Sequence, residues 1–329
     1  MLALAASRAA ASGMDAADIA DLKQRIGRMY DRAGSRTRYF DASPPRGAAI
    51  DMVTQASRRA LADAGTTAAD VDLIIYCSVS RGWLEPSTAA AVQAAIGAGN
   101  ASCFDVLEAC AGWMRAVEIA DAMMQGGRYR NALVVGVEEG LQEAIMPTAP
   151  GSRIRDEHIA GYTVGAAASA MLIEPDPSRP IEVDIRSNGE FHTLCMIPLP
   201  SVAAFVPDDG SDLPIPGRFL SHSEKLFARA GQGLVRFMRP RLSPADREEI
   251  ALFILHGASA NAGEALRRLM HIPQSKWLCA HAEFGNTVAM SMPVALDFAI
   301  GAGRIERGDR ICFLVASAGL SYGYGMLTY

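Results

Sequence analysis

Several patterns that would identify a metal or cofactor site are missing from this chain of 329 residues. The six cysteines include no C-x-x-C pair and the six histidines no H-E-x-x-H, so the ligand spacings of zinc sites are absent. There is no P-loop, no G-x-S-x-G and no G-x-G-x-x-G after a strand-like run. We therefore expect no metal, no bound cofactor and neither phosphate-loop nor nicotinamide chemistry.

Long apolar runs and an excess of positive charge are lacking as well. No run approaches the roughly 18 apolar residues of a membrane span, and the net charge of −5 gives no general attraction to nucleic acid. The opening MLALAASRAAAS is interrupted by Arg8 too early for a convincing signal peptide. A chain that is half apolar and one-fifth charged can bury a large core. We expect a globular, cytoplasmic protein with no membrane span and no nucleic-acid partner.

What the sequence does contain is a single cysteine at the point where a strand-like run changes to helical spacing. The apolar run 104–107 is followed by Glu108, Ala109 and Cys110, and apolar residues then recur at helical intervals from Trp113. The first turn of a helix has unpaired amides and a partial positive charge, and both favour thiolate over thiol. Cys110 is therefore a candidate nucleophile with a lowered pKa. The alternative, which spacing alone favours, is a small buried core residue.

One pattern occurs twice along the chain. Two pairs of segments correspond, namely 66–80 with 242–259 and 131–140 with 309–319. Leu73 matches Leu252, and Leu133 matches Ile311 at nearly the same separation along the chain. Continuous apolar strands that alternate with helices predict mixed or parallel sheets covered on both faces.

The repeat predicts an α/β fold of two similar halves, packed as five layers, α/β/α/β/α, with two mixed sheets. The halves are residues 1–180, which carry the cysteine, and residues 181–329. Two segments fall outside the repeat, 141–160 and the proline-rich 190–222. We expect them to form lids or binding loops, the alternative being plain surface excursions.

The duplication also predicts that polar residues of the two halves meet. FILH places His256 at the end of a strand, and AEFGNTV places Asn286 at a turn, two residues before Val288, which we take as the repeat position of Cys110. Corresponding strand ends lie side by side about a pseudo-twofold axis, so Cys110, His256 and Asn286 are expected to converge. Taken singly, His256 is more often a core histidine and Asn286 a helix cap.

These segments resemble the thiolase superfamily, in its ketoacyl-synthase-III-like branch, over nearly the whole chain. DVLEACAGWMRAVEIADAMMQGGRYRNALVVGVE is similar to the nucleophile segment of that branch and ILHGASAN to its histidine segment. FGNTVAMSMPVALDFAI and GDRICFLVASAGLSYG resemble its asparagine and C-terminal segments. RMYDRAGSRTR, WLEPSTA, EFHTLC and YTVGAAA resemble the olefin-biosynthesis type, which joins two acyl-CoA molecules head to head without decarboxylation.

The resemblance implies a duplicated thiolase fold and an enzyme that condenses acyl thioesters into a β-keto product. Cys110 would take an acyl group from a coenzyme A or acyl-carrier-protein thioester, and His256 with Asn286 would hold the enolate oxygen of the second thioester. The amide of Cys110 and an amide of the turn at Ala318 and Gly319 would hold the oxyanion. Coenzyme A and the carrier protein would act as substrates, not as bound cofactors.

The resemblance also implies a homodimer in which the loop SVSRGWLEPST enters the site of the partner. Glu85 of that loop would then face Cys110 of the other subunit and remove an α-proton. Some residues depart from the family pattern: Gly257 follows the histidine, Ala318 replaces a serine of the olefin type, and no aromatic residue near Arg28 can stack on adenine. The opening strand of the family is absent or replaced by the alanine-rich residues 1–20.

Several alternatives stay open. Arg153, Arg155, Arg267 and Arg268 are candidates for binding the phosphates of coenzyme A or of a carrier's phosphopantetheine, or else belong to a solvated charged face. Decarboxylative condensation with a malonyl thioester, or acyl transfer to oxygen or nitrogen, would use the same cysteine, histidine and asparagine. A non-catalytic subunit of a heterodimer is the remaining alternative, although it predicts that these three residues are eroded, and they are all present.

Overall fold

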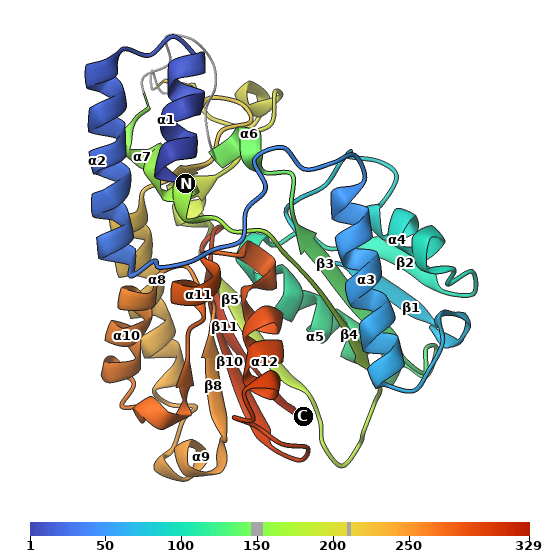
Figure 1. Ribbon diagram of the computed structural model, residues 1–329. Helices are drawn as coiled ribbons and strands as arrows, with labels where there is room; N and C mark the ends of the chain where they lie inside the picture. The colour runs from blue at the N-terminus through green and yellow to red at the C-terminus, as the bar shows by residue number, and fades with distance from the viewer. Residues whose placement is uncertain (146–153, 209–211) are drawn as a thin grey trace.

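Continuous apolar runs form the central strands of two sheets in the computed structural model, which describes residues 1–145, 154–208 and 212–329 (Figure 1). The first sheet has the order β2-β1-β3-β4 and consists of β1 (Leu73–Tyr76), β2 (Ser102–Asp105), β3 (Ala132–Glu138) and β4 (Ala167–Ile173). The second has the order β5-β11-β10-β8-β9 and consists of β5 (Glu182–Ser187), β8 (Leu252–Leu255), β9 (Trp277–Leu278), β10 (Arg310–Ser317) and β11 (Ser321–Thr328). Both sheets are mixed, and β6 (Cys195–Met196) pairs separately with β7 (Leu220–Ser221).

Helices lie between and outside the sheets. The α-helices are α1 (Leu2–Ala11), α2 (Ala16–Ala33), α3 (Ala48–Asp63), α4 (Thr88–Ile96), α5 (Gly112–Gln125), α6 (Gln142–Ile145), α7 (Asp156–Ile159), α8 (Ser223–Met238), α9 (Pro244–Glu249), α10 (Ala260–Leu269), α11 (His281–Phe284) and α12 (Ser291–Gly301). The 3-10 helices are η1 (Ala68–Asp70), η2 (Ala109–Ala111), η3 (Ala160–Thr163), η4 (Gly189–Leu194), η5 (Val202–Ala204), η6 (Gln274–Lys276) and η7 (Val288–Met290).

The central strands are buried on both faces, and alternate residues belong to different layers. In β1, Leu73 and Ile75 join the apolar cluster that contains α5 and α12, whereas Ile74 and Tyr76 join the cluster covered by α3 and α4. In the second sheet, Leu252 belongs to the same central cluster, and the opposite face is covered by α8 and α10. The layers follow one another as α3/α4, first sheet, α5/α12, second sheet and α8/α10, which confirms the five-layered fold.

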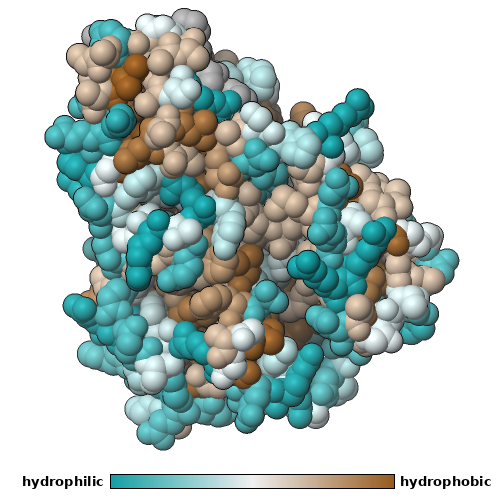
Figure 2. Space-filling view, viewed as in Figure 1, coloured by the Kyte–Doolittle hydropathy of each residue, from teal (hydrophilic) through white to brown (hydrophobic). Residues whose placement is uncertain are grey.

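The outer helices are amphipathic, as this layering requires. On the face shown in Figure 2, hydrophilic side chains dominate the surface over α10 and α3, while their apolar sides belong to the buried clusters. In the part of the chain that the structure describes, no helix combines the length and the apolar character needed to cross a membrane.

The strand register fixes how the two halves correspond. β1 pairs with β3 through Leu73 and Ala132, and β8 pairs with β10 through Leu252 and Ile311. The residues Leu73, Leu252, Ala132 and Ile311 all belong to the central apolar cluster, whereas Leu133 belongs to the cluster on the other face of its sheet. Leu73 therefore matches Leu252 as predicted, but Ile311 corresponds to Ala132 and not to Leu133, so that prediction is wrong by one residue. Continuous apolar strands do not alternate in polarity, so their sequence carries little information on register.

The first half lacks a counterpart of β5. No strand precedes β1 in residues 1–72, all of which the structure describes, and the expected absence of the opening strand is confirmed. A helical hairpin, α1 and α2, occupies this part of the chain. Asp15 begins α2 by accepting the N–H of Asp18 at 2.8 Å, and Gly34 ends it with a left-handed φ of +69°. The predicted boundary at residue 180 falls in the connection between β4 and β5.

Two glycines of α8 test how this helix packs on the second sheet. A Cβ atom at Gly233 would come within 2.7 Å of the Tyr322 ring of β11, whereas one at Gly231 would meet nothing within 4 Å. We expect Gly233→Ala to lower the melting temperature through overpacking worth about 1–3 kcal/mol. Gly231→Ala should raise it, because alanine is favoured over glycine in a helix by about 1 kcal/mol. Equal melting temperatures by circular dichroism would contradict the described packing.

Candidate active site

Cys110 lies in η2, between the end of β2 and the start of α5. The residue before it, Ala109, has a φ of +44°, in the left-handed region that residues with a side chain rarely adopt. η7 of the second half begins in the same way, with a φ of +45° at Val288. These two left-handed residues have the same separation along the chain as Leu73 and Leu252, so the counterpart of Cys110 is Ala289. The predicted match of Cys110 with Val288 is therefore wrong by one residue.

His256 and Asn286 each keep a polar group without a partner among the described residues. The His256 N–H donates to Leu314 O at 2.9 Å, which ties it to β10, while its Nδ1 is buried without a hydrogen bond. Asn286 Oδ1 accepts the N–H of Val288 at 3.0 Å. Because Oδ1 is used in this way, the Asn286 NH₂ group is the donor left for a ligand.

The turns that carry these residues pack together at the carboxyl ends of the central strands. η2 contacts both η7 and β10. A Cβ atom added to Gly257, next to His256, would lie 3.7 Å from the carbonyl oxygen of Gly285, next to Asn286. The site is thus built from one turn of the first half and two of the second, and the chemical roles of Cys110, His256 and Asn286 stay predictions.

Burial dominates the electrostatics of the nucleophile candidate. It raises the pKa of Cys110 well above the ordinary thiol value; Cys195 and Glu138 add to the rise, and the Cys110 amide and Ser317 oppose it. A helix N-terminus contributes about 0.3–1 kcal/mol, which is less than the roughly 1.4 kcal/mol that corresponds to one pKa unit. The prediction of a lowered Cys110 pKa is therefore wrong, and this thiol needs a base.

His256 is the candidate for that base because its ring is neutral and its Nδ1 has no hydrogen-bond partner among the described residues, while burial also lowers its basicity. Burial, with a smaller contribution from His281, lowers the pKa of His256 to about 4, so its ring is neutral at pH 7. His281 is fixed on both nitrogens: Nδ1 lies 2.7 Å from Gly257 O and Nε2 lies 2.7 Å from Ser35 Oγ. Since a carbonyl only accepts, His281 Nδ1 carries the hydrogen, and its bond holds the residue that follows His256.

The sequence analysis missed Glu138, a carboxylate with 1% exposure at the end of β3. It accepts the N–H groups of Val79 at 3.0 Å, Ser80 at 3.1 Å and Ala289 at 3.4 Å. Burial raises its pKa to about 7, although these hydrogen bonds oppose the rise. Glu138 ties the start of the Glu85 loop to η7. The run LVVGVE could have indicated this residue, because an acidic side chain there directly continues an apolar strand that is fully buried.

A cavity of about 630 Å³ lies beside the candidate site, between α2, α7, α8 and the start of α10. Its lining includes the basic residues Arg25, Arg28, Arg32 and Lys225. Three other lining residues are neighbours of residues in or beside the candidate site. The Thr163 carbonyl oxygen accepts the Asn286 N–H at 2.9 Å, and Ala258 follows His256 by two residues. Ser221 forms a hydrogen bond with Cys195. The predicted binding segments 141–160 and 190–222 both contribute to the wall of this cavity.

The four arginines proposed for phosphate binding are placed elsewhere. Arg153 lies outside the described residues, and Arg155 forms ion pairs with Glu157 at 3.7 Å and Asp212 at 3.6 Å. Arg267 and Arg268 share Glu264 at 2.7 and 2.8 Å. Arg155, Arg267 and Arg268 do not line the cavity.

Among the arginines of the cavity, one is available. Arg25 pairs with Asp156 at 2.7 Å and Arg32 with Glu224 at 3.6 Å. Arg28 makes no ion pair with any residue that the structure describes. Of the three arginines in this wall, it is therefore the one whose guanidinium can bind an anionic ligand without first losing an ion pair.

Glu85 lies on an exposed loop of the single chain, beside apolar side chains that are uncovered. Trp83 is 41% and Leu84 is 76% exposed, which is unusual for such large apolar groups and is typical of surfaces that meet another chain. Within one chain Glu85 is not among the groups whose charge acts on Cys110.

The turn expected to supply an oxyanion donor connects β10 to β11. Gly319 has a φ of +125°, and neither Ala318 nor Gly319 donates its amide to another described residue. The amides of this turn therefore stay available for a ligand, on the side of the site where Ser317 reaches η2.

The fold and these turns define a condensing acyltransferase of the thiolase type. The family model "3-Oxoacyl-[acyl-carrier-protein (ACP)] synthase III" matches residues 104–189, and the model of its C-terminal part matches residues 243–329. The β-ketoacyl-[acyl-carrier-protein] synthase III of Aquifex aeolicus is 30% identical over 84% of this chain and 83% of its own length. That of Clostridium perfringens is 27% identical over 84% and 83%. The chain belongs to the β-ketoacyl-[acyl-carrier-protein] synthase III family, and it is an enzyme that condenses acyl thioesters.

Solved structures show the same fold. The Aquifex aeolicus synthase III has a TM-score of 0.77 at 28% identity, covering 94% of each chain. OleA of Xanthomonas campestris, solved with bound lauric acid and lauroyl-CoA, has a TM-score of 0.73 at 25% identity, covering 94% of this chain and 93% of its own. The predicted thiolase fold and ketoacyl-synthase-III-like branch are confirmed.

The electrostatics of the site predict its reactivity toward an alkylating agent. The alkylation rate of Cys110 by iodoacetamide should keep rising above pH 9, with no plateau between pH 6 and 8, because burial disfavours the thiolate. Peptide mass spectrometry of the Cys110 peptide measures this rate. In His256→Ala the profile should not move to higher pH, since a neutral imidazole does not stabilise a thiolate. A plateau below pH 8 that His256→Ala removes would show a thiolate–imidazolium pair instead.

Proposed function

We propose that this enzyme condenses two acyl thioesters without decarboxylation, through an acyl group carried on Cys110. The observation that carries the acyl-enzyme step is the presence of a partly buried thiol and of a buried imidazole that is neutral at pH 7 at the ends of the central strands. The free NH₂ group of Asn286 completes a set of one nucleophile, one base and one neutral donor. A homodimer is part of the proposal, because Glu85 acts from the partner subunit.

Acylation follows from the protonation states of the free site. His256 takes the proton of Cys110 as the sulfur attacks the thioester carbonyl, and it returns that proton to the departing thiol. The amides of Cys110 and of the Ala318–Gly319 turn receive the negative charge of the tetrahedral oxygen. His256 is neutral again when the acyl-enzyme has formed, so its N–H can serve as a donor in the next step.

Condensation needs a carbanion at the α-carbon of one acyl group. In this step the carboxylate of Glu85 from the partner subunit removes the α-proton of the second thioester. His256 and Asn286 donate hydrogen bonds to the oxygen of the enolate that forms. The carbanion of the second thioester attacks the carbonyl carbon of the acyl group on Cys110. The new carbon–carbon bond forms as the bond from that carbonyl carbon to the Cys110 sulfur breaks, and the proton that Glu85 removed restores the Cys110 thiol. The exposed apolar residues Trp83 and Leu84 support a loop that packs into a second subunit.

The cavity beside the site supports a long donor that carries phosphate. Phosphopantetheine is the part common to coenzyme A and to acyl carrier protein. The cavity is lined by the cations Arg28 and Lys225, which suit its phosphate, and by Thr163 and Ala258, which adjoin the candidate site. Neither a metal nor an added cofactor has a role in the proposed chemistry.

Decarboxylative condensation with a malonyl thioester is the second candidate. The curated relatives at 26–30% identity are named β-ketoacyl-[acyl-carrier-protein] synthase III, and Ala318 stands where the resemblance to the olefin type expects serine. In that reaction loss of carbon dioxide generates the carbanion, so Glu85 would have no proton to remove.

Product analysis separates the two reactions. We expect the enzyme to form a β-keto product from acyl-CoA alone, with no stimulation by malonyl-CoA, and to form none as Cys110→Ala. Liquid chromatography with mass spectrometry measures the product, and intact-mass spectrometry measures the acyl group on Cys110. A strict requirement for malonyl-CoA or malonyl carrier protein would overturn the non-decarboxylative reaction.

Glu85→Ala provides the matched control for the second step. It should leave acylation of Cys110 unchanged and abolish condensation, because the thiol and His256 are intact while the α-proton has no acceptor. Mixing Glu85→Ala with Cys110→Ala subunits should restore part of the activity, since one site in each mixed dimer then has both groups. A Glu85→Ala enzyme that condenses at the wild-type rate would remove Glu85 from the mechanism.

The cavity predicts which arginine binds the donor. We expect Arg28→Glu to raise KM for acyl-CoA about tenfold with little change in kcat, the loss of one charge-assisted hydrogen bond of about 1.5 kcal/mol. Arg268→Glu, at a residue paired with Glu264 away from the cavity, is the matched control and should leave KM unchanged. Steady-state kinetics at fixed ionic strength measure both. An effect of Arg268→Glu equal to that of Arg28→Glu would contradict the assignment.

A further inference from the structure

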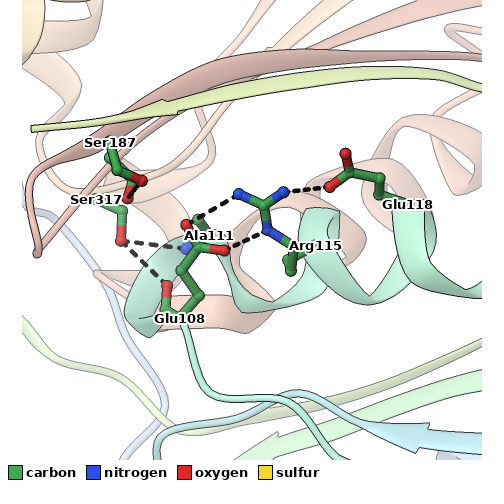
Figure 3. Close-up of polar contacts among 7 residues, drawn as sticks. Glu108, Ala111, Arg115, Glu118, Ser187 and Ser317 are labelled. Carbon is green, nitrogen blue, oxygen red and sulfur yellow. Dashed lines mark hydrogen bonds and ion pairs between the residues drawn. The ribbon is translucent and has the colours of Figure 1, made fainter.

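The side chain of Ser317, the last residue of β10, reaches into the turn that carries Cys110 (Figure 3). Its Oγ accepts the N–H of Ala111 at 3.2 Å and donates to the carbonyl oxygen of Glu108 at 3.3 Å. Ser317 is 2% exposed, so both bonds are made away from bulk water. The Ala111 N–H also donates directly to the Glu108 carbonyl oxygen at 2.9 Å, so the hydroxyl adds a second connection between the two ends of the turn that contains Ala109 and Cys110.

Glu108 is held through its side chain as well. Arg115 of α5 binds the Glu108 carboxylate with both ends of its guanidinium, Nε to Oε2 at 2.6 Å and Nη2 to Oε1 at 3.3 Å, and also binds Glu118 (Figure 3). A left-handed residue such as Ala109 costs about 1–3 kcal/mol and persists only where its surroundings impose it. The ion pair and the Ser317 hydroxyl are the groups that hold this turn from opposite sides.

The repeat supplies an independent argument. Glu138 is the last residue of β3 and Ser317 the last residue of β10, and their separation along the chain equals that of Leu73 and Leu252, so the two are counterparts. Glu138 of the first half reaches the amide of Ala289 in η7, and Ser317 of the second half reaches the amide of Ala111 in η2. Because Ala289 is the counterpart of Cys110, Ser317 holds its turn one residue further along than Glu138 holds the other turn. Each half thus holds the strained turn of the other half with the side chain at the end of its own central strand.

We propose that Ser317 is a positioning residue for the nucleophile, whose hydroxyl keeps the turn of Cys110 aligned with the amides of Ala318 and Gly319. The inference rests on the proposed role of Cys110. Ser317 is covalently next to the Ala318–Gly319 turn and is hydrogen-bonded to both ends of the Cys110 turn, so it joins the two parts of the oxyanion site, which come from different halves. Misalignment of such donors by about 1 Å costs on the order of 10² in rate.

The chemical difference between the two counterparts fits this role. A carboxylate at residue 317 would place a second negative charge beside Cys110 and oppose its ionisation, whereas a hydroxyl holds an amide of this turn without charge. At η7 no nucleophile is present, because Ala289 stands where the first half has Cys110, and a carboxylate is tolerated there.

The test compares Ser317→Ala and Ser317→Gly, which remove the hydroxyl, with Ser317→Thr, which keeps it. Ser321→Ala is the matched control, because Ser321 pairs with Ser317 across the β10–β11 hairpin but bonds to Ser187 at 3.2 Å instead of to η2. In Ser317→Ala and Ser317→Gly we expect the rate of Cys110 acylation at saturating acyl-CoA to fall at least tenfold. The KM for acyl-CoA should change less than threefold. Ser317→Thr and Ser321→Ala should stay within threefold of the wild type.

Alkylation of Cys110 by iodoacetamide gives a second readout that needs no substrate. Its rate profile should move to higher pH in Ser317→Ala and Ser317→Gly and stay in place in Ser317→Thr, while Cys195 and Glu138, the other groups acting on Cys110, are unchanged. Wild-type acylation and an unmoved profile in both deletions, or equal losses in Ser317→Thr, would overturn the proposal. If no thioester acylates even the wild type, the proposed function fails, and the alkylation profiles still decide whether Ser317 positions the thiol.

Discussion

The rest of the structure depends on the close approach of α5 and α12 to the two sheets that enclose them. The approach is set by small residues: a Cβ atom at Gly112 would collide with the carbonyl of Cys77, and one at Gly136 would collide with the side chains of Ser78 and Met290. The helices begin close to the strand ends, and the turns that precede them have left-handed backbone at Ala109 and Val288. The site is built from these two strained turns, which the bonds of Ser317, Arg115 and Glu138 hold in place.

Burial then determines the chemistry of the site. A charged thiolate or imidazolium would be costly in this environment, so the free site holds a neutral thiol and a neutral imidazole at pH 7. The proton moves only when a substrate supplies an electrophile. Glu138 can be buried because three backbone amides and the Ser80 hydroxyl donate hydrogen bonds to its carboxylate. Its raised pKa means that this group favours the folded state most below pH 4.5 and loses that advantage as pH rises through 7.

Sequence patterns were sufficient for the layers, the repeat and the absence of an opening strand, because these follow from long apolar periodicities and from motifs that resemble a known family. They were insufficient for register, where a continuous apolar strand allows a slip from Ala132 to Leu133. They also failed on the pKa of Cys110, since burial is a property of the whole fold and not of the helix start. Ser317 was not predicted because its partners lie in the other half of the chain, and Glu138 because its partners Val79, Ser80 and Ala289 are all distant from it along the chain. Arg267 and Arg268 form ion pairs with Glu264, which a list of charges does not reveal.

The first sheet has one strand fewer than the second, and residues 1–33 form a helical hairpin instead. Helix α2 of that hairpin forms one wall of the cavity and belongs to neither sheet. It is hydrogen-bonded to α10 through Asn261, whose side chain donates to the carbonyl oxygens of Asp31 and Arg32 at 3.0 Å. Under the proposed function, part of the surface that meets the donor therefore lies outside the layered core. Substitutions at exposed residues of α2 would then change the size and charge of the carrier that the enzyme accepts while the packing of the strained turns stays the same.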